Sequence, residues 1–99
     1  MKILDIFATI NHKLMKIIEA NWIAFHLYED TGKTKKYLVV TKECFPKKLG
    51  EIKWFGKWRK YSFFPEPNTI FENQCLNDII KFIEKLMLER KIEKQISQN

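Results

Sequence analysis

The chain has 99 residues, 45% of them hydrophobic and 14% aromatic, and its 18 basic side chains outnumber 12 acidic ones. This length permits one domain with one compact core, and the apolar content excludes a disordered tail. No apolar run approaches the roughly 18 residues of a membrane-spanning helix, and Asp5, Asn11 and His12 interrupt the first apolar stretch in a way untypical of signal peptides. We therefore expect a single domain over residues 1–99 of a cytoplasmic protein that does not bind membranes.

The positive charge is concentrated in the middle of the chain. Residues 33–60 contain ten basic and two acidic side chains, whereas residues 1–32 contain three and four, and residues 61–99 contain five and six. A concentrated basic segment is typical of proteins that bind polyanions. The expected partners are therefore nucleic acid or an acidic host protein.

The residue types that carry out chemistry are scattered. Cys44 and Cys75 lie 31 residues apart and form neither a CxxC motif nor a disulfide framework. The histidines are distant from both cysteines, so no metal or other cofactor is predicted. Cys75 and His26 would suit a nucleophile and its base, but core packing at the start of an amphipathic helix explains Cys75 better. The known nucleotide-binding and hydrolase motifs are absent, and we expect no enzymatic activity.

Residues 2–20 have the periodicity of a helix. Apolar residues recur there at steps of four and three: Ile3, Phe7, Ile10, Leu14 and Ile17. We expect this stripe to pack beside a C-terminal helix within a monomer. The alternative is a homodimer in which the stripe packs against that of a second subunit.

Four strands are predicted after this helix, over residues 22–29, 36–42, 49–55 and 58–64. The first alternates, with Ile23, Phe25 and Leu27 on one face. Turn residues around Gly32 separate it from the second strand. Short connections between consecutive strands favour an antiparallel meander.

The last two strands form a hairpin in this prediction, with Gly56 and Lys57 as a two-residue type II′ turn. That register places Trp54 opposite Arg59. It also puts Ile52 and Trp54 on one face with Tyr61 and Phe63, and leaves Lys53, Phe55 and Lys60 on the other. A slip of one residue would exchange the two faces.

A C-terminal helix is predicted from about residue 74 to residue 90 or beyond, with Asn73 as its N-cap. Its apolar stripe is Leu76, Ile79, Ile80, Ile83, Leu86 and Met87. The predicted fold is α+β, in the order α-β-β-β-β-α: a four-stranded antiparallel meander packed by the C-terminal helix. The domain would comprise an N-terminal helix (1–20), the sheet with its helix (21–90) and a frayed polar tail (91–99).

The hairpin and the start of the helix carry a specific pattern, LGxIxWxxxWRxYxFFP over residues 49–65 and CLxDIxxF over residues 75–82. This pattern resembles a small family of bacterial and phage proteins. The resemblance covers about residues 34–86 and implies a small protein of phage or mobile-element context, built on a hairpin and a helix. It supplies no catalytic residue.

The cluster of lysines and aromatic residues in the hairpin is the best candidate for a site. Nucleic-acid sites combine cations for phosphates with exposed rings for base stacking. The alternative is that the rings pack on each other while the lysines are merely solvated. The candidate nucleic-acid-binding residues are Lys53, Phe55, Lys57, Trp58, Lys60, Lys35, Lys36, Lys47 and Lys48.

We therefore expect a small non-enzymatic binding protein that binds nucleic acid through a basic aromatic hairpin face. The alternative function is a protein–protein interaction module, such as an inhibitor of a host or anti-phage defence complex.

Overall fold

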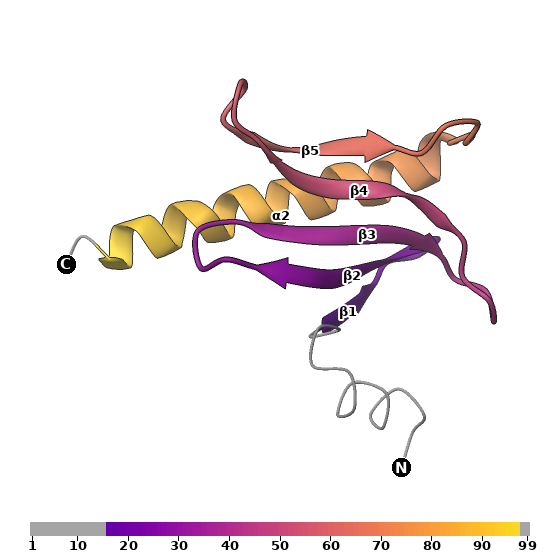
Figure 1. Ribbon diagram of the computed structural model, residues 1–99, viewed down its shortest axis with the longest axis horizontal. Helices are drawn as coiled ribbons and strands as arrows, with labels where there is room; N and C mark the ends of the chain where they lie inside the picture. Colours follow the sequence, from indigo (N-terminus) through magenta and orange to yellow (C-terminus); the bar gives the residue numbers. More distant parts are fainter. Residues whose placement is uncertain (1–15, 98–99) are drawn as a thin grey trace, which may run out of the picture.

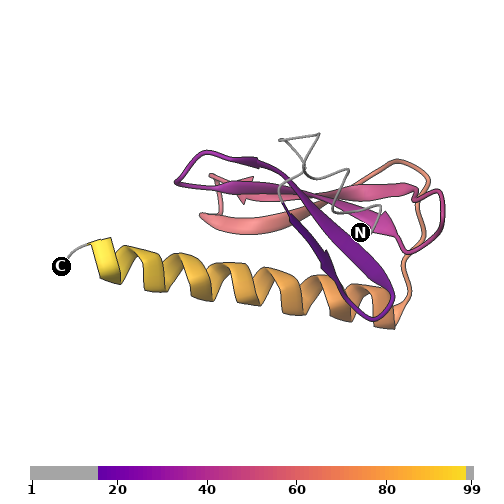
Figure 2. The same cartoon turned by 90° about the horizontal axis from the view of Figure 1, so that it is seen from below.

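The computed structural model describes residues 16–97, which form a five-stranded antiparallel sheet with one helix against one face (Figures 1 and 2). The strands follow each other in the sheet in chain order, so the fold is an α+β meander. Within the described part of the chain, no helix is both long and apolar enough to span a bilayer. The elements are β1 (Lys16–Glu19), β2 (Ile23–Asp30), β3 (Lys35–Thr41), β4 (Lys48–Phe55), β5 (Lys60–Pro65) and α2 (Asn73–Ser97).

The predicted fold of four strands and two helices is wrong, because the described residues form five strands and one helix. The additional strand is β1. Residues 16–19, assigned to the end of an N-terminal helix, form β1 instead. Ile18 pairs with Phe25 of β2 and packs against the core. Adjacent β-branched residues such as Ile17 and Ile18 suit a strand, and their pairing covers an edge of β2 that would otherwise be open. The remainder of the predicted helix, with its packing or dimerisation stripe, lies outside the described residues.

The four predicted strands correspond to β2–β5, but the hairpin turn between β4 and β5 is longer than predicted. The backbone N–H groups of Trp58 and Arg59 both donate to the carbonyl of Phe55, at 3.2 and 2.9 Å, and Arg59 adopts a positive φ of 56°. Trp54 therefore pairs with Tyr61, not with Arg59. The partner shifts by two residues, an even number, so the predicted faces of the strands are kept.

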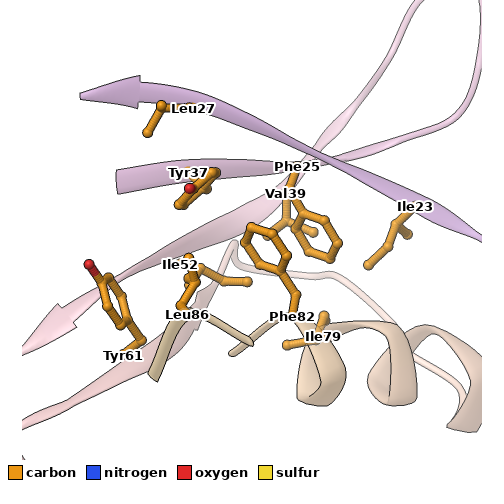
Figure 3. Packing of buried hydrophobic residues seen from close by; sticks show 10 residues of the cluster. All are labelled: Ile23, Phe25, Leu27, Tyr37, Val39, Ile52, Tyr61, Ile79, Phe82 and Leu86. Atoms are coloured by element: carbon orange, nitrogen blue, oxygen red, sulfur yellow. The ribbon is translucent and has the colours of Figure 1, made fainter. Parts of the chain in front are cut away.

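The core lies between α2 and the face of the sheet that carries Phe25 and Tyr37 (Figure 3). Phe82 from α2 stacks on Phe25 with ring centroids 4.0 Å apart, and its ring meets the edge of Tyr37 at 4.8 Å. The same environment raises the pKa of the Tyr37 hydroxyl to about 12, mainly through burial. The sheet residues of the core are Ile23, Phe25, Leu27, Tyr37, Val39, Ile52 and Tyr61, and the helix residues are Ile79, Phe82 and Leu86.

The stripe of α2 that faces the core differs from the predicted one. Phe82, which we placed outside the stripe, is buried, whereas Leu76 and Ile80 are 42% and 53% exposed. Residues 75, 79, 82 and 86 also follow helical spacing, and their stripe brings the largest side chain of the helix onto the sheet. Packing of that aromatic ring thus fixes the rotation of the helix.

Both ends of α2 also differ from the prediction. Glu72, not Asn73, caps the N-terminus, since its carboxylate accepts the N–H of Cys75 at 2.8 Å; backbone hydrogen bonds of this kind lower the pKa of Glu72. The helix continues to Ser97, through most of the tail that we expected to fray. Arg90 anchors this last part, because it donates to the carbonyl of Lys33 at 2.6 Å and lies over the ring of Trp54 at 4.1 Å.

Candidate nucleic-acid interface

The β4–β5 hairpin ends in a group of cations and aromatic rings that we call the tip surface. Strand alternation places Lys53, Phe55 and Lys60 on the face of the sheet opposite α2, where Phe55 and Lys60 pair directly. The turn that follows Phe55 adds Trp58, whose side chain is 67% exposed. The tip surface consists of Lys53, Phe55, Lys57, Trp58, Arg59 and Lys60.

The aromatic rings of this region contact one another in a row. The Phe55 ring meets Trp58 edge to face, with centroids 4.8 Å apart, and meets Phe64 in the same way at 5.9 Å. The ammonium group of Lys53 lies 4.6 Å from the centre of the Phe64 ring. These contacts hold Trp58 in place from one side only, so its exposed ring remains available for stacking on a ligand.

The cations of the tip surface differ from most other lysines of the sheet in forming no ion pair with a described acid, and of the four only Lys53 contributes to the lowered pKa of Glu51. Among the described residues, no carboxylate forms an ion pair with Lys53, Lys57, Arg59 or Lys60. By contrast, Lys36 pairs with Glu29 at 3.2 Å, and Lys48 with Glu51 at 3.1 Å. The positive charge at the tip is therefore available to an anionic ligand.

The other predicted site residues are not gathered at one place. Lys35 and Lys36 begin β3, at the end of the sheet where the β4–β5 turn also lies (Figure 1), but Lys35 is 4.0 Å from Glu93 of α2. Lys47 and Lys48 lie at the opposite end, where β4 begins. The structure thus brings together the five candidates from the hairpin and separates them from Lys47 and Lys48.

Sequence reasoning missed Arg59 as a member of the tip surface. We had placed it in a strand, opposite Trp54, but the cation that lies over the Trp54 ring is Arg90 of α2. No signal in the hairpin alone identifies Arg90, which lies 36 positions along the chain from Trp54. A four-residue turn over residues 56–59 would have placed Arg59 at the tip, and such turns are common in hairpins.

The middle of the same sheet face is electrically neutralised. The Tyr28 hydroxyl donates to the Glu51 carboxylate, which also accepts from Lys48 at 3.1 Å. The hydrogen bond from Tyr28 is the main reason why the pKa of Glu51 is lowered, and burial raises the pKa of Tyr28. Next to this network, burial lowers the pKa of His26. Unpaired charge on this face is therefore concentrated at the tip.

The pairing of Cys75 with His26 as nucleophile and base is not formed. Cys75 packs against the core from α2, whereas His26 projects from the opposite face of β2, so the sheet lies between them. Burial is the main cause of a raised pKa of the Cys75 thiol, which works against its reactivity. Within residues 16–97, no group of three or more His, Cys, Asp or Glu side chains is placed to hold a metal ion.

The fold and this surface define a small α+β protein in which a five-stranded meander presents a basic aromatic hairpin. Among known proteins, the chain is similar to an uncharacterised 9.3 kDa protein of Acholeplasma phage L2, with 46% identity over 43 residues. The match covers 43% of this chain and 55% of the phage protein. No family model matches the chain, and no solved structure matches it significantly. The similarity supports a phage-like context and carries no function with it.

Proposed function

We propose that this protein binds nucleic acid through the tip surface and prefers single strands. The observation that carries the proposal is the exposed ring of Trp58 among cations that lack ion pairs with the described residues. Phosphates attract such cations irrespective of base sequence. An exposed indole adds stacking energy with any base that is not already stacked within a duplex.

The geometry favours an extended strand over a duplex. Trp58, Phe55 and Phe64 form a row of rings, and the ammonium group of Lys53 lies over the last of them. A strand that follows this row would place bases near the rings and phosphates near Lys57 and Lys60. Base–aromatic stacking contributes about 1–3 kcal/mol per base in single-strand binding.

Fluorescence anisotropy with labelled oligonucleotides tests the proposal. Single-stranded and duplex oligonucleotides of the same sequence are titrated with the full chain at two or more salt concentrations. If all four tip cations contact phosphates, the logarithm of the association constant should fall with the logarithm of salt concentration with a slope of about −3 for single strands. Absence of binding at low salt would contradict the proposal, and equal binding of both forms would contradict the preference.

Matched variants locate the binding surface. Trp58→Ala should weaken single-strand binding by roughly tenfold or more through the loss of stacking. Lys57→Ala should weaken it and reduce the salt slope, whereas Lys47→Ala removes an exposed lysine at the opposite end and should leave binding unchanged. Equal effects of the two lysine variants would show that binding depends on net charge rather than on the tip.

A second candidate function is protein binding, as an interaction module that inhibits a host or anti-phage defence complex. It is favoured by the large apolar side chains of Phe45 and Ile70, which are 86% and 94% exposed. Both lie in connections at the end of the sheet opposite the tip surface (Figure 1). Affinity capture from host lysate, with and without nuclease, separates the two functions: partners that survive nuclease support protein binding, and partners that are all lost support the first proposal.

We also propose that the chain belongs to the small bacterial and phage family with the LGxIxWxxxWRxYxFFP pattern and acts without catalysis. In this structure the pattern covers β4, the tip and β5, and its second part starts α2. The similarity to the phage L2 protein supports this placement. Proteins that share the pattern should therefore retain the aromatic hairpin packed on a helix.

A further inference from the structure

A hollow of about 540 Å³ lies between the β1–β2 turn and the first turns of α2, at the end of the molecule opposite the tip surface. Figure 2 shows this turn reaching the start of the helix. The volume falls within the range of about 300–1,000 Å³ that is usual for small-molecule sites. The polar and aromatic part of the lining consists of Asn21, Trp22, Asn73, Gln74, Asn77 and Asp78.

A buried carboxylate holds the two sides of this hollow together. The Oδ2 atom of Asp78 accepts the backbone N–H of Trp22 at 2.8 Å, although Asp78 is only 6% exposed. Its Oδ1 atom accepts no hydrogen bond from a described residue. No fully buried side-chain oxygen within residues 16–97 lacks a partner, so Oδ1 must be reached by solvent. The hollow is therefore preformed, and Asp78 retains an oxygen that can accept a hydrogen bond from a ligand.

Carboxamide side chains are concentrated around this hollow. Of the six Asn and Gln residues within residues 16–97, four line it: Asn21 from the turn, and Asn73, Gln74 and Asn77 from α2. All four residues are exposed, so their amide groups are open to solvent. Asn73 and Asn77 are one helical turn apart and therefore share a face of α2. Each carboxamide offers two donors and an acceptor in one plane, which suits a ligand that both donates and accepts hydrogen bonds.

The charge and the position of the hollow narrow the class of ligand. None of the described residues that line it is basic, and Asp78 is the one acid among them, so a phosphate or a carboxylate is disfavoured. None of them belongs to a strand either, so an added peptide strand would find no backbone groups to pair with. Trp22 supplies an aromatic wall that is 55% exposed. The expected ligand is therefore neutral, rich in hydroxyl groups and flat enough on one side to pack against an indole ring.

We propose that this hollow binds a neutral pyranose sugar. The C–H face of the sugar ring packs on the indole of Trp22, and its hydroxyl groups, which both donate and accept, pair with the carboxamides of Asn73 and Asn77. Asp78 accepts a hydrogen bond from one hydroxyl through Oδ1. A site that pairs with hydroxyl groups discriminates between sugars that differ in the position of one hydroxyl. The site is separate from the tip surface, and the inference stands whether or not the tip binds nucleic acid.

Nuclear magnetic resonance with the full ¹⁵N-labelled chain tests this inference, because side-chain NH₂ groups and the indole N–H give signals of their own. The probes are the methyl glycosides of glucose, galactose, mannose and N-acetylglucosamine, titrated at millimolar concentrations. We expect saturable shifts of the side-chain signals of Trp22, Asn73 and Asn77, with different affinities for the four sugars. The inference is overturned if no glycoside shifts these signals, if all four bind equally, or if the shifts map to Trp58 instead. Adenosine, a neutral ligand that can also stack on Trp22, would overturn it by binding more tightly than every glycoside.

Matched variants locate the sugar. Trp22→Ala should weaken glycoside binding by roughly tenfold or more, whereas Trp22→Phe keeps a ring and should retain most of it; both keep the backbone N–H that Asp78 accepts. Asn77→Ala should weaken binding by roughly five- to tenfold. Gln95→Ala removes an exposed carboxamide near the other end of α2 and should leave binding unchanged. Circular dichroism checks that each variant is folded. Equal effects of Asn77→Ala and Gln95→Ala, or unchanged binding by a folded Trp22→Ala variant, would overturn the inference.

Discussion

The two faces of the sheet are made from the same strands, yet they differ in how their side chains are used. In β4, Ile52 is fully buried beneath α2, whereas the neighbouring Glu51 and Lys53 point to the other side. On the helix-covered face, aromatic rings such as Phe25 and Phe82 contact each other within the core. On the open face, Trp58 contacts Phe55 but remains mostly exposed. Alternation along a strand therefore separates the residues that stabilise this fold from those that are available to a ligand.

The largest expected effect comes from breaking the helix-covered face at Phe82. Phe82→Ala removes a buried ring that stacks on Phe25 and meets the edge of Tyr37, and should lower the free energy of unfolding by about 3–5 kcal/mol. Phe64→Ala, on the open face, removes a half-buried ring and should cost less than about 2 kcal/mol. Urea denaturation of both variants measures the difference. Equal losses would mean that the two faces contribute equally to stability.

A smaller effect is expected from adding one methyl group where the strands approach closely. A Cβ atom at Gly50 would lie 2.5 Å from the carbonyl oxygen of Phe64 and 2.7 Å from the Phe63 ring. Gly50→Ala should therefore destabilise the protein by about 1–3 kcal/mol, because backbone and ring must both move. Gly56→Ala is the matched control, since its Cβ meets no atom within 4 Å. A neutral Gly50→Ala would show that β5 adjusts without cost.

The pH dependence of stability tests the neutralised middle of the open face. The folded-state pKa of Glu51 is lowered from its ordinary value of 4.5, chiefly by the hydrogen bond from Tyr28. A lowered pKa means that the ionised carboxylate stabilises the fold above pH 4.5, and that this contribution is lost as pH falls through the folded-state pKa. The stability difference between wild type and Glu51→Gln should be below about 1 kcal/mol near neutrality and should narrow in acid.

His26 contributes a change of the same sign, because burial lowers its pKa and proton uptake below pH 6.5 favours the unfolded chain. That contribution is present in both wild type and Glu51→Gln, so it cancels in their difference. Thermal unfolding across this pH range measures the effect. A difference that widens in acid would contradict the assignment of the hydrogen bond to the ionised form of Glu51.

The features that could be predicted from the sequence are those that depend on local periodicity. Alternation placed Ile23, Phe25 and Leu27 together on one face, which the structure shows to be the buried one. Ile52 and Tyr61 were predicted as core residues of the hairpin, and this was confirmed even though the hairpin turn was wrong. The turn was predicted two residues too short, and this error shifted every predicted pair of β4 and β5 residues by two positions. An even shift leaves each side chain on its predicted face of the sheet. The same parity kept Lys53, Phe55 and Lys60 together as a candidate site.

The features that escaped prediction depend on contacts between distant segments. The local sequence around Ile17 and Ile18 is compatible with both a helix and a strand. These residues form a strand because they pair with β2, whose edge would otherwise be open. Two apolar stripes on α2 have helical spacing. The stripe that contains Phe82 faces the sheet, because Phe82 stacks on Phe25. Arg90 lies within the predicted helix, but its contact with Trp54 depends on how α2 packs across the hairpin, which local sequence does not determine. Each of these choices is made by tertiary packing, which overrides local propensity.

The smallest effect on stability is expected at the tip surface, where the comparison of the two faces is sharpest. Lys57→Ala combined with Lys60→Ala removes two exposed cations that form no ion pair with the described residues. The free energy of unfolding should therefore change by less than about 0.5 kcal/mol. Single-strand binding should nevertheless weaken, and the salt slope should decrease by about 1 to 1.5 because two phosphate contacts are lost. Urea denaturation and anisotropy on one preparation measure both. A variant that loses stability and binding together would show that the tip supports the fold; one that keeps both would show that its cations are merely solvated.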